Sequence, residues 1–204
     1  MQKIYTQEIH DKLYRDITEF RTLFKLPIEI KSGTFTPEDD IRHQALAVEE
    51  LTELAVADTL VEQADALCDA LYVNQGRIVH LGHKKIGDAP GLIYLNELIF
   101  QVATALNIDL LACWDIVHAS NMSKICSDHK QYRETADFYR KQNILVEPES
   151  TLKHNNRDPS KSLSGIIVKC AQDTQTESKF IKKGKILKNV HYKAANLDPV
   201  PLLK

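Results

Sequence analysis

Apolar residues recur every three or four positions through most of the first 126 residues, and this period limits the possible folds more than any other feature. The first such stripe consists of Ile9, Leu13, Ile17, Phe20 and Phe24. It ends before Pro27, which cannot continue a helix. Because a stripe with this spacing lies on one face of an α-helix, the sequence predicts an all-α helical bundle that begins with a helix at about residues 9–24.

Two further helices are predicted to form an antiparallel pair. Thr36 followed by Pro37 is typical of a helix start, and this helix is expected to reach about Asp58. Thr59 and Glu62 fit a capping box at the start of the next helix, which is expected to reach about residue 79. Since so short a connection joins the two helices, we expect them to pack antiparallel.

Two more helical segments are predicted to complete the core. The sequence GHKKIGDAPG at 82–91 interrupts the helical pattern, which resumes at 92–106 and at 109–125. Residues 1–126 are therefore predicted to form one helical core domain.

The chain after Cys126 has a different character. Residues 127–183 are mostly polar and are predicted to be an insertion of unknown role, with a short helix near 134–142 and one strand at 165–171. The basic segment 184–204 is expected to complete the core. Minor β structure is expected in the insertion and the C-terminal extension.

Composition argues against several classes of partner. The chain has 26 basic and 28 acidic residues and a formal net charge of -2, so we expect neither nucleic acid nor an anionic membrane as a partner. Any basic site must then be local, as in KFIKKGKILKNVHY, which contains lysines 179, 182, 183, 185 and 188. The four cysteines are widely spaced and the chain has no apolar run of membrane-spanning length. Reduced thiols and a cytoplasmic protein are therefore expected.

Carboxylates are unusually frequent on the predicted helix pair. On its first helix, Glu50 and Glu53 are three residues apart and Glu49 lies beside them. On its second helix, one line contains Glu62, Asp65, Asp69 and Tyr72. The stripe of Glu50 also contains Leu46, Leu54 and Ala57, which indicates that it faces the bundle. The two acidic lines are therefore predicted to face each other.

The repulsion between facing carboxylates must be offset by another interaction. Two like charges about 5 Å apart repel by about 3 kcal/mol at an effective dielectric constant near 20. No basic residue lies between Val48 and Tyr72 to offset this repulsion. A divalent cation with oxygen ligands is the most economical explanation, and Mg²⁺ suits carboxylates that share it with phosphates. The simpler interpretation is a solvated acidic face on which Glu62 is only the capping-box acid.

The acidic pattern carries a family resemblance. ELTE at 50–53, followed by EQAD at 62–65 and its continuation to Tyr72, resembles the ExxE and ExxD signature of the all-α nucleoside triphosphate pyrophosphohydrolases, the MazG-like and phosphoribosyl-ATP pyrophosphohydrolase-like superfamily. VHASNMSKI at 117–125 and GKILKNVHY at 184–192 are similar to two further elements of that family. The three matches occur in the family's order.

The resemblance implies a reaction and a role for each residue. It implies Mg²⁺-dependent hydrolysis, with Mn²⁺ as a substitute, of a nucleoside or deoxynucleoside triphosphate to the monophosphate and pyrophosphate. The implied metal ligands are Glu50, Glu53, Glu62 and Asp65, and Glu49 is the implied catalytic group that orients or deprotonates the attacking water. The implied substrate-binding residues are Asp69, Tyr72, Asn121, Lys124, Lys185, Lys188 and Tyr192.

Other functions stay open at this level. Hydrolysis of phosphoribosyl-ATP is an alternative reaction, and a non-catalytic helical nucleotide-binding module is an alternative class. Family members commonly complete their site by dimerising, and the apolar segment 92–106 has few partners within the chain. We therefore expect a homodimer or a dimer of dimers.

Overall fold

The computed structural model describes residues 3–28, 35–153, 163–176 and 180–203. It divides into two compact units, which are treated separately below. Unit 1 comprises Met1–Thr22, Leu26–His118 and Ala195–Lys204, and unit 2 comprises Leu23–Lys25 and Ala119–Ala194. The sequence instead predicted a core that ends at residue 126 and is completed by 184–204. In the structure, residues 119–126 and 184–194 are part of unit 2.

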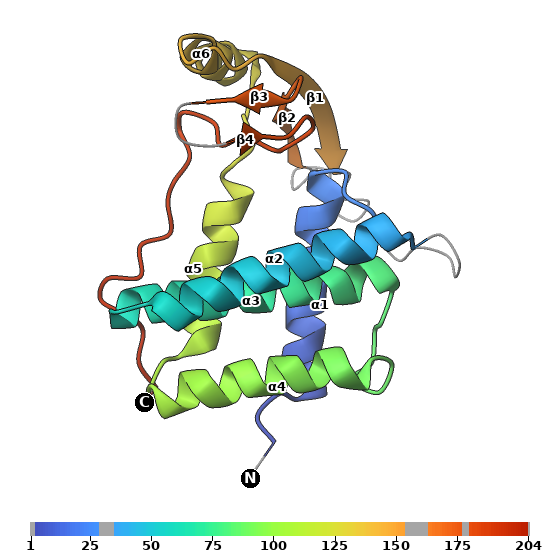
Figure 1. The fold of residues 1–204 in the computed structure, drawn as a ribbon, viewed down its shortest axis with the longest axis vertical. Coiled ribbons are helices and arrows are strands. Elements are labelled where there is room, and N and C mark those ends of the chain that lie inside the picture. Colours follow the sequence, from blue (N-terminus) through green and yellow to red (C-terminus); the bar gives the residue numbers. More distant parts are fainter. Residues whose placement is uncertain (1–2, 29–34, 154–162, 177–179, 204) are drawn as a thin grey trace. The chain divides into compact units, whose positions relative to one another are not determined.

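Five long helices precede the insertion, and their order is the predicted one (Figure 1). They are α1 Gln7–Leu23, α2 Pro37–Val56, α3 Leu60–Leu81, α4 Pro90–Ala105 and α5 Leu110–Met122. The core of unit 1 contains Leu13 and Ile17 from α1, Leu67 and Leu71 from α3, and Trp114 from α5, each no more than 1% exposed. The predicted all-α fold is thus confirmed, because the apolar stripes of the helices meet in one core.

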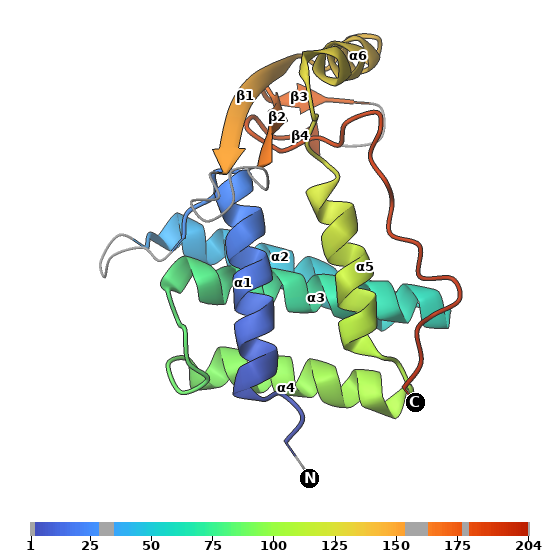
Figure 2. The same cartoon turned by 180° about the vertical axis from the view of Figure 1, so that it is seen from behind.

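The helix pair α2 and α3 is defined by local capping. Thr36 Oγ1 accepts a hydrogen bond from Asp39 N at 3.1 Å, and Thr59 Oγ1 accepts one from Glu62 N at 3.2 Å. Gly82, with φ 74°, ends α3 in the left-handed region that favours glycine. The two helices lie side by side in both views (Figures 1 and 2). The predicted helix start at Thr36 and Pro37, the predicted capping box of Thr59 and Glu62, and the short α2–α3 connection are confirmed.

α2 is attached to unit 1 mainly along one narrow face. His43 is its buried side chain among the described residues, at 6% exposed. The Nε2 of His43 lies 3.0 Å from Nδ1 of His80 on α3. The opposite face of α2 carries Ile41, Val48 and Val56, which are 64%, 64% and 70% exposed. These three side chains give α2 an exposed apolar surface.

Unit 2 combines one helix with two small antiparallel sheets. Its elements are α6 His129–Arg140, β1 Val146–Lys153, β2 Leu163–Cys170, β3 Thr174–Gln175 and β4 Phe180–Ile181. β1 pairs with β2, and β3 pairs with β4. The chain then runs beside β2, where Leu187 N donates to the carbonyl of Val168 at 2.8 Å. A small core contains Cys126, Ile144, Ile166, Val168, Cys170, Ile181 and Leu187.

Three details differ from the sequence-based expectation. The helix predicted at 134–142 starts earlier, at His129, because Asp128 Oδ1 accepts a hydrogen bond from Gln131 N at 2.9 Å and caps it. β1 was missed because VEPESTLK is polar and contains proline. The helix predicted at 109–125 ends at Met122. Lys179, predicted as part of the basic run, lies outside the described residues.

The four cysteines, Cys68, Cys113, Cys126 and Cys170, are free and buried, as reduced thiols require. Among the described helices, none has the length and apolarity needed to cross a membrane.

Candidate functional site

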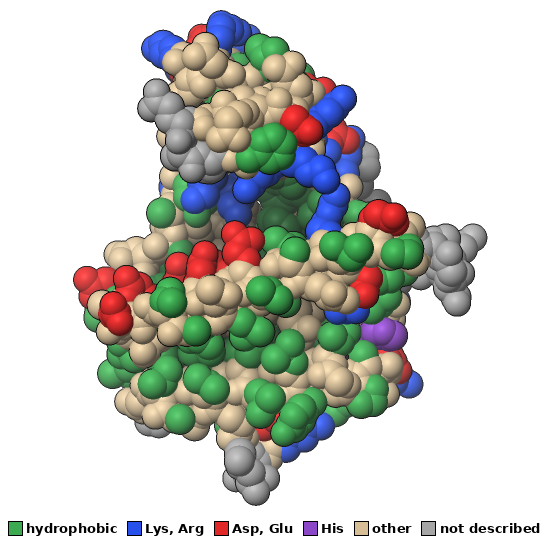
Figure 3. All heavy atoms as spheres, in the orientation of Figure 1, with side chains coloured by type: hydrophobic (Ala, Val, Ile, Leu, Met, Phe, Trp, Pro, Cys, Tyr) green, Lys and Arg blue, Asp and Glu red, His purple; other side chains and the backbone are tan. Residues whose placement is uncertain are grey.

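The acidic residues of α2 and α3 converge on Glu50. Glu50 is half-buried, and burial is the largest cause that raises the pKa of its carboxyl to about 7. The negative charges of Asp69, Glu53, Glu49 and Asp65 raise the same pKa further. Acids of both helices therefore influence the same carboxyl, and the predicted facing of the two acidic lines stays a prediction. In the view of Figure 3, acidic side chains gather along this helix pair.

We expect Glu50 to make the metal-free protein less stable as the pH rises. Its folded-state pKa lies near 7, above the usual value of 4.5 for a glutamate, so the cost of ionising it grows between these two pH values and is complete above pH 7. After allowance for solvent screening, this cost is about 1–3 kcal/mol. Glu50→Gln should remove it. Urea denaturation in EDTA at pH 5 and pH 8 measures the difference.

Glu38→Gln is the matched control, because Glu38 is an exposed acid in the first turn of the same helix. Its pH dependence should resemble that of the wild type. If Glu50→Gln also kept the wild-type pH dependence, Glu50 would not be the carboxyl group whose ionisation destabilises the metal-free protein.

Glu62 has a different environment from the other acids. Its Oε2 accepts hydrogen bonds from Asp58 N at 3.0 Å, Thr59 N at 2.9 Å and Thr59 Oγ1 at 3.0 Å. The hydrogen bond from Thr59 N is the largest cause that lowers the pKa of Glu62. Glu62 is exposed and is not among the charges that act on Glu50. One oxygen of this predicted ligand is thus already engaged in the capping box.

The donor chemistry of the acidic cluster fits a hard divalent cation. Carboxylate oxygens are the ligands that Mg²⁺ prefers, and a cation would offset both the burial and the nearby negative charges that raise the pKa of Glu50. Within the part of the chain that the structure describes, no three His, Cys, Asp or Glu side chains are already arranged to hold a metal ion. Binding would therefore require the side chains on α2 and α3 to close around the ion.

An aromatic group continues the acidic line of α3. Tyr72 follows Asp69 by one helical turn, and its hydroxyl lies 3.1 Å from Nδ1 of His118. The Tyr72 ring packs against Trp114 and Phe20, with centroids 5.0 and 5.4 Å apart. Trp114 is fully buried and donates Nε1–H to Asp16 Oδ2 at 3.0 Å, so it is a core residue. Sequence reasoning missed His118 as the partner of Tyr72, because only the fold brings α3 and α5 together.

The basic residues that were predicted to bind substrate lie in unit 2, and several of them are neighbours. Lys124 Nζ donates to Asn121 Oδ1 at 2.5 Å. Ser120 Oγ donates to the hydroxyl of Tyr192 at 2.8 Å. The ammonium of Lys188 lies 4.5 Å from the centroid of the Tyr192 ring. Two segments about 70 residues apart in sequence therefore meet at the C-terminal end of α5. Lys185, four residues beyond β4, is exposed.

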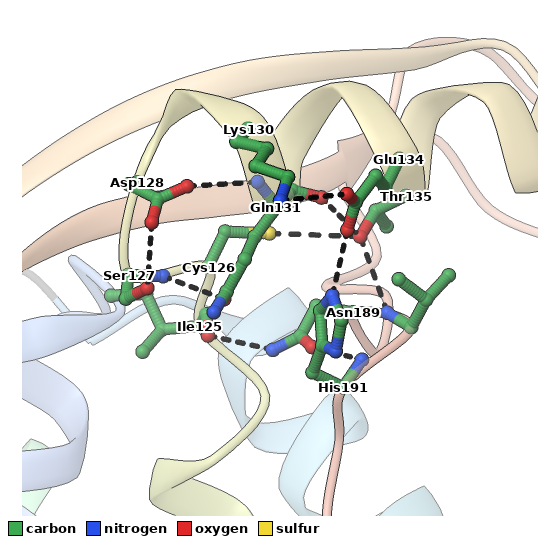
Figure 4. A network of polar contacts seen from close by, with 11 residues as sticks. Ile125, Cys126, Ser127, Asp128, Lys130, Gln131, Glu134, Thr135, Asn189 and His191 are labelled. Atoms are coloured by element: carbon green, nitrogen blue, oxygen red, sulfur yellow. Dashed lines mark hydrogen bonds and ion pairs between the residues drawn. The ribbon is translucent and has the colours of Figure 1, made fainter.

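Asn189 fixes the basic segment in place (Figure 4). Its Nδ2 donates to the carbonyls of Ser123 at 2.8 Å and Ile125 at 2.6 Å, and its Oδ1 accepts from His191 N at 2.6 Å. Asn189 is only 4% exposed. Its role could not be found from sequence, because its partners are backbone groups of a distant segment. Asn189 holds Lys188 and Tyr192 beside the end of α5.

The candidate residues thus form two sets. Glu49, Glu50, Glu53, Glu62, Asp65, Asp69 and Tyr72 belong to unit 1, and Asn121, Lys124, Lys185, Lys188 and Tyr192 belong to unit 2. Glu49 and Glu53 are exposed on α2, and Asp65 is exposed on α3. The first set can bind a cation and the second can bind an anion such as a polyphosphate.

Comparison with known families gives one match. A family model described as phosphoribosyl-ATP pyrophosphohydrolase matches residues 17–84. This span contains α2, α3 and every acid of the first set, whereas the basic set lies outside it. Neither a search of curated proteins nor a search of solved structures gives a match.

Proposed function

We propose, from the premise that residues 17–84 are a domain of the MazG-like all-α nucleoside triphosphate pyrophosphohydrolase superfamily, that this chain hydrolyses a standard or modified (deoxy)nucleoside triphosphate in a Mg²⁺-dependent reaction. The products are the nucleoside monophosphate and pyrophosphate. The matched family supports hydrolysis of a nucleotide phosphoanhydride. The observation that carries the proposal is the half-buried Glu50, whose pKa is raised first by burial and then by the charges of Asp69, Glu53, Glu49 and Asp65.

The carboxylates divide into metal ligands and a base. Glu50, Glu53, Asp65 and Glu62 would hold the magnesium, and Glu62 would use the oxygen that is not engaged in the capping box. Bound Mg²⁺ withdraws charge from the phosphate oxygens and orients the phosphates. Glu49 takes a proton from a water as its oxygen bonds to phosphorus, while the α–β anhydride bond breaks and pyrophosphate leaves. Mn²⁺ is the expected substitute for Mg²⁺.

The remaining candidates bind the nucleotide. Lys185 and Lys188 offer positive charge to the polyphosphate, and Asn121 and Lys124 offer donors to sugar or phosphate oxygens. The Tyr192 ring lies beside Lys188. The distance from the Lys188 ammonium to the centroid of the Tyr192 ring is 4.5 Å. Asp69 and Tyr72 are the two substrate-binding candidates on α3, three residues apart along the helix.

Phosphoribosyl-ATP is a second candidate substrate, because the matched family is described by that reaction. It has the same phosphoanhydride, so the acidic cluster does not distinguish the two. The additional unit 2 is the reason for ranking it second, since residues 119–194 lie beyond the matched span. A non-catalytic nucleotide-binding module is the remaining alternative.

Pyrophosphate release from a panel of substrates distinguishes these functions. The panel should contain standard and modified nucleoside triphosphates and phosphoribosyl-ATP, each with Mg²⁺, with Mn²⁺ and with EDTA. We expect metal-dependent release from at least one triphosphate. Release from phosphoribosyl-ATP alone would establish the second candidate, and Mg²⁺-dependent nucleotide binding without release would establish the non-catalytic module.

The proposal includes self-association through unit 1. α4 contains one charged residue, Glu97, which accepts hydrogen bonds from Ile4 N and Tyr5 N at 3.0 and 2.7 Å. Its outer face carries Tyr94, Leu98 and Val102, which are 64%, 42% and 41% exposed. A helix that is apolar on all sides is normally buried. This surface and the outer face of α2 are suited to a second copy of the chain.

Leu98→Lys should therefore weaken the dimer. Placing a charge at the centre of an apolar interface costs about 2 kcal/mol or more, which corresponds to a dimer Kd raised roughly 30-fold. Light scattering over a micromolar concentration series measures the shift. Leu145→Lys, at a 51% exposed leucine in unit 2, is the matched control and should leave the mass unchanged. A monomeric wild-type protein would contradict the dimer.

A further inference from the structure

The two units carry opposite charges that cancel in the whole chain. Unit 1 contains 10 basic and 20 acidic residues, and unit 2 contains 16 basic and 8 acidic residues, so their formal charges are -10 and +8. The net charge of -2 led to the expectation that nucleic acid would not bind. That expectation treated the chain as one body. For unit 2 alone the charge favours binding of nucleic acid, because a strongly basic unit attracts polyanions.

The acids of unit 2 are mostly engaged locally. Glu149 pairs with Lys25 at 3.2 Å and also with Lys169. Glu134 pairs with His191 at 2.8 Å, and Asp137 pairs with Arg140 at 2.6 Å. These three acids are paired within unit 2, and the unit as a whole keeps its formal charge of +8.

Lys182 and Lys183 are the clearest part of that remaining charge. Both are exposed and follow β4 directly. Asp173 accepts a hydrogen bond from the backbone N of Lys183 at 2.7 Å. No ion pair involves either ammonium within the described part of unit 2. Figure 3 shows Lys and Arg side chains gathered on this unit.

Exposed aromatic side chains accompany these lysines. Ile181 of β4 is 3% exposed and belongs to the small core, whereas the adjacent Phe180 is 57% exposed. Because side chains alternate along a strand, Phe180 points away from that core. Phe138 on α6 is 48% exposed. An apolar ring beside lysines is the combination that binds unpaired bases and backbone phosphates together.

We propose that unit 2 binds single-stranded nucleic acid, with Lys182 and Lys183 at backbone phosphates and Phe180 stacked on a base. This activity is separate from nucleotide hydrolysis, because none of these three residues is assigned to the substrate site. Stacking on an exposed ring favours a single strand over a duplex, in which the bases already stack on each other.

Fluorescence anisotropy with the full chain tests the proposal. The probes are labelled 20-nucleotide oligo(dT) and oligo(U) in EDTA, titrated between 50 and 200 mM salt. Lys182→Gln/Lys183→Gln should weaken binding and lower the slope of log Kd against log salt by about 1.4, because two phosphate contacts are lost at about 0.7 each. Phe180→Ala should weaken binding at least about fivefold, since stacking on one base is lost.

The chain offers a matched control. Lys84 and Lys85 are also adjacent, exposed lysines, but they lie in acidic unit 1. Lys84→Gln/Lys85→Gln should leave both the affinity and the salt slope unchanged. Glu53→Gln, designed to stop hydrolysis, should also bind the oligonucleotide normally, so failure of one activity is distinguishable from failure of the other.

Several results would overturn the proposal. They are absence of binding at 50 mM salt, equal losses in the two double-lysine variants, and tighter binding of duplex than of single strand. Affinity for polyglutamate equal to that for the oligonucleotides would also overturn the proposal, because the surface would then bind any polyanion. Preference for oligo(U) or for oligo(dT) would assign the strand as RNA or DNA, and either supports the proposal.

Discussion

Glu53→Gln should abolish Mg²⁺-dependent pyrophosphate release while leaving the metal-free protein as stable as the wild type or more stable. Glu53 is one of the charges that raise the pKa of Glu50, so removing its charge relieves repulsion in the metal-free state. With magnesium, the same change deletes a ligand. Metal stabilisation of phosphate charge is worth several kcal/mol, so turnover should fall at least roughly 10³-fold. Pyrophosphate release and melting temperature, each with and without Mg²⁺, measure both effects.

Two other variants of α2 and α3 serve as comparisons for Glu53→Gln. Glu38→Gln changes an exposed acid on the same helix outside the cluster and should keep turnover. Glu62→Gln should lower stability modestly, because it removes the charge of the capping-box acceptor. Its effect on turnover should be smaller than that of Glu53→Gln, because one Glu62 oxygen is already committed to Asp58 and Thr59. Near-normal metal-dependent turnover of Glu53→Gln would remove the acidic cluster from the site, and the proposed function with it.

Glu49→Gln should separate catalysis from metal binding. As the group that takes the proton of the attacking water, Glu49 should contribute roughly 10²- to 10⁴-fold to turnover. The four proposed ligands remain in this variant, so magnesium affinity should change much less than in Glu53→Gln. Calorimetric titration of Mg²⁺ alongside steady-state turnover tests the distinction. If Glu49→Gln lost metal affinity and turnover together, Glu49 would be a ligand and another group would activate the water.

The polar partners of the site also bear on its mechanism. Tyr72 is held by His118, and Lys188 and Tyr192 are held in place through Asn189. Both anchors use contacts between segments far apart in sequence, Tyr72 with His118 and Asn189 with the carbonyls of Ser123 and Ile125. Positioning residues of this kind are invisible to pattern analysis, although the residues that they hold were predicted.

Much of the fold could be predicted, because helix boundaries depend on local chemistry. Thr36 and Thr59 start α2 and α3 by bonding to residues three positions away, and apolar spacing alone identifies the core stripe of α1. β1 could not be predicted, since its pairing with β2 is non-local and its own side chains are polar. The capping of α6 by Asp128 is local, and that signal was present but was not used.

The sequence by itself determined the all-α class, the α2–α3 pair and a line of carboxylates on each of these two helices, because helical periodicity sets which side chains share a face. Only the tertiary structure decided how these carboxylates differ. It leaves Glu50 half-buried and under the influence of four other acids, and it holds Glu62 in its capping box. It also placed the positive and negative charges of the chain in separate units, which no net charge can reveal, because a sum over the sequence contains no information on distance.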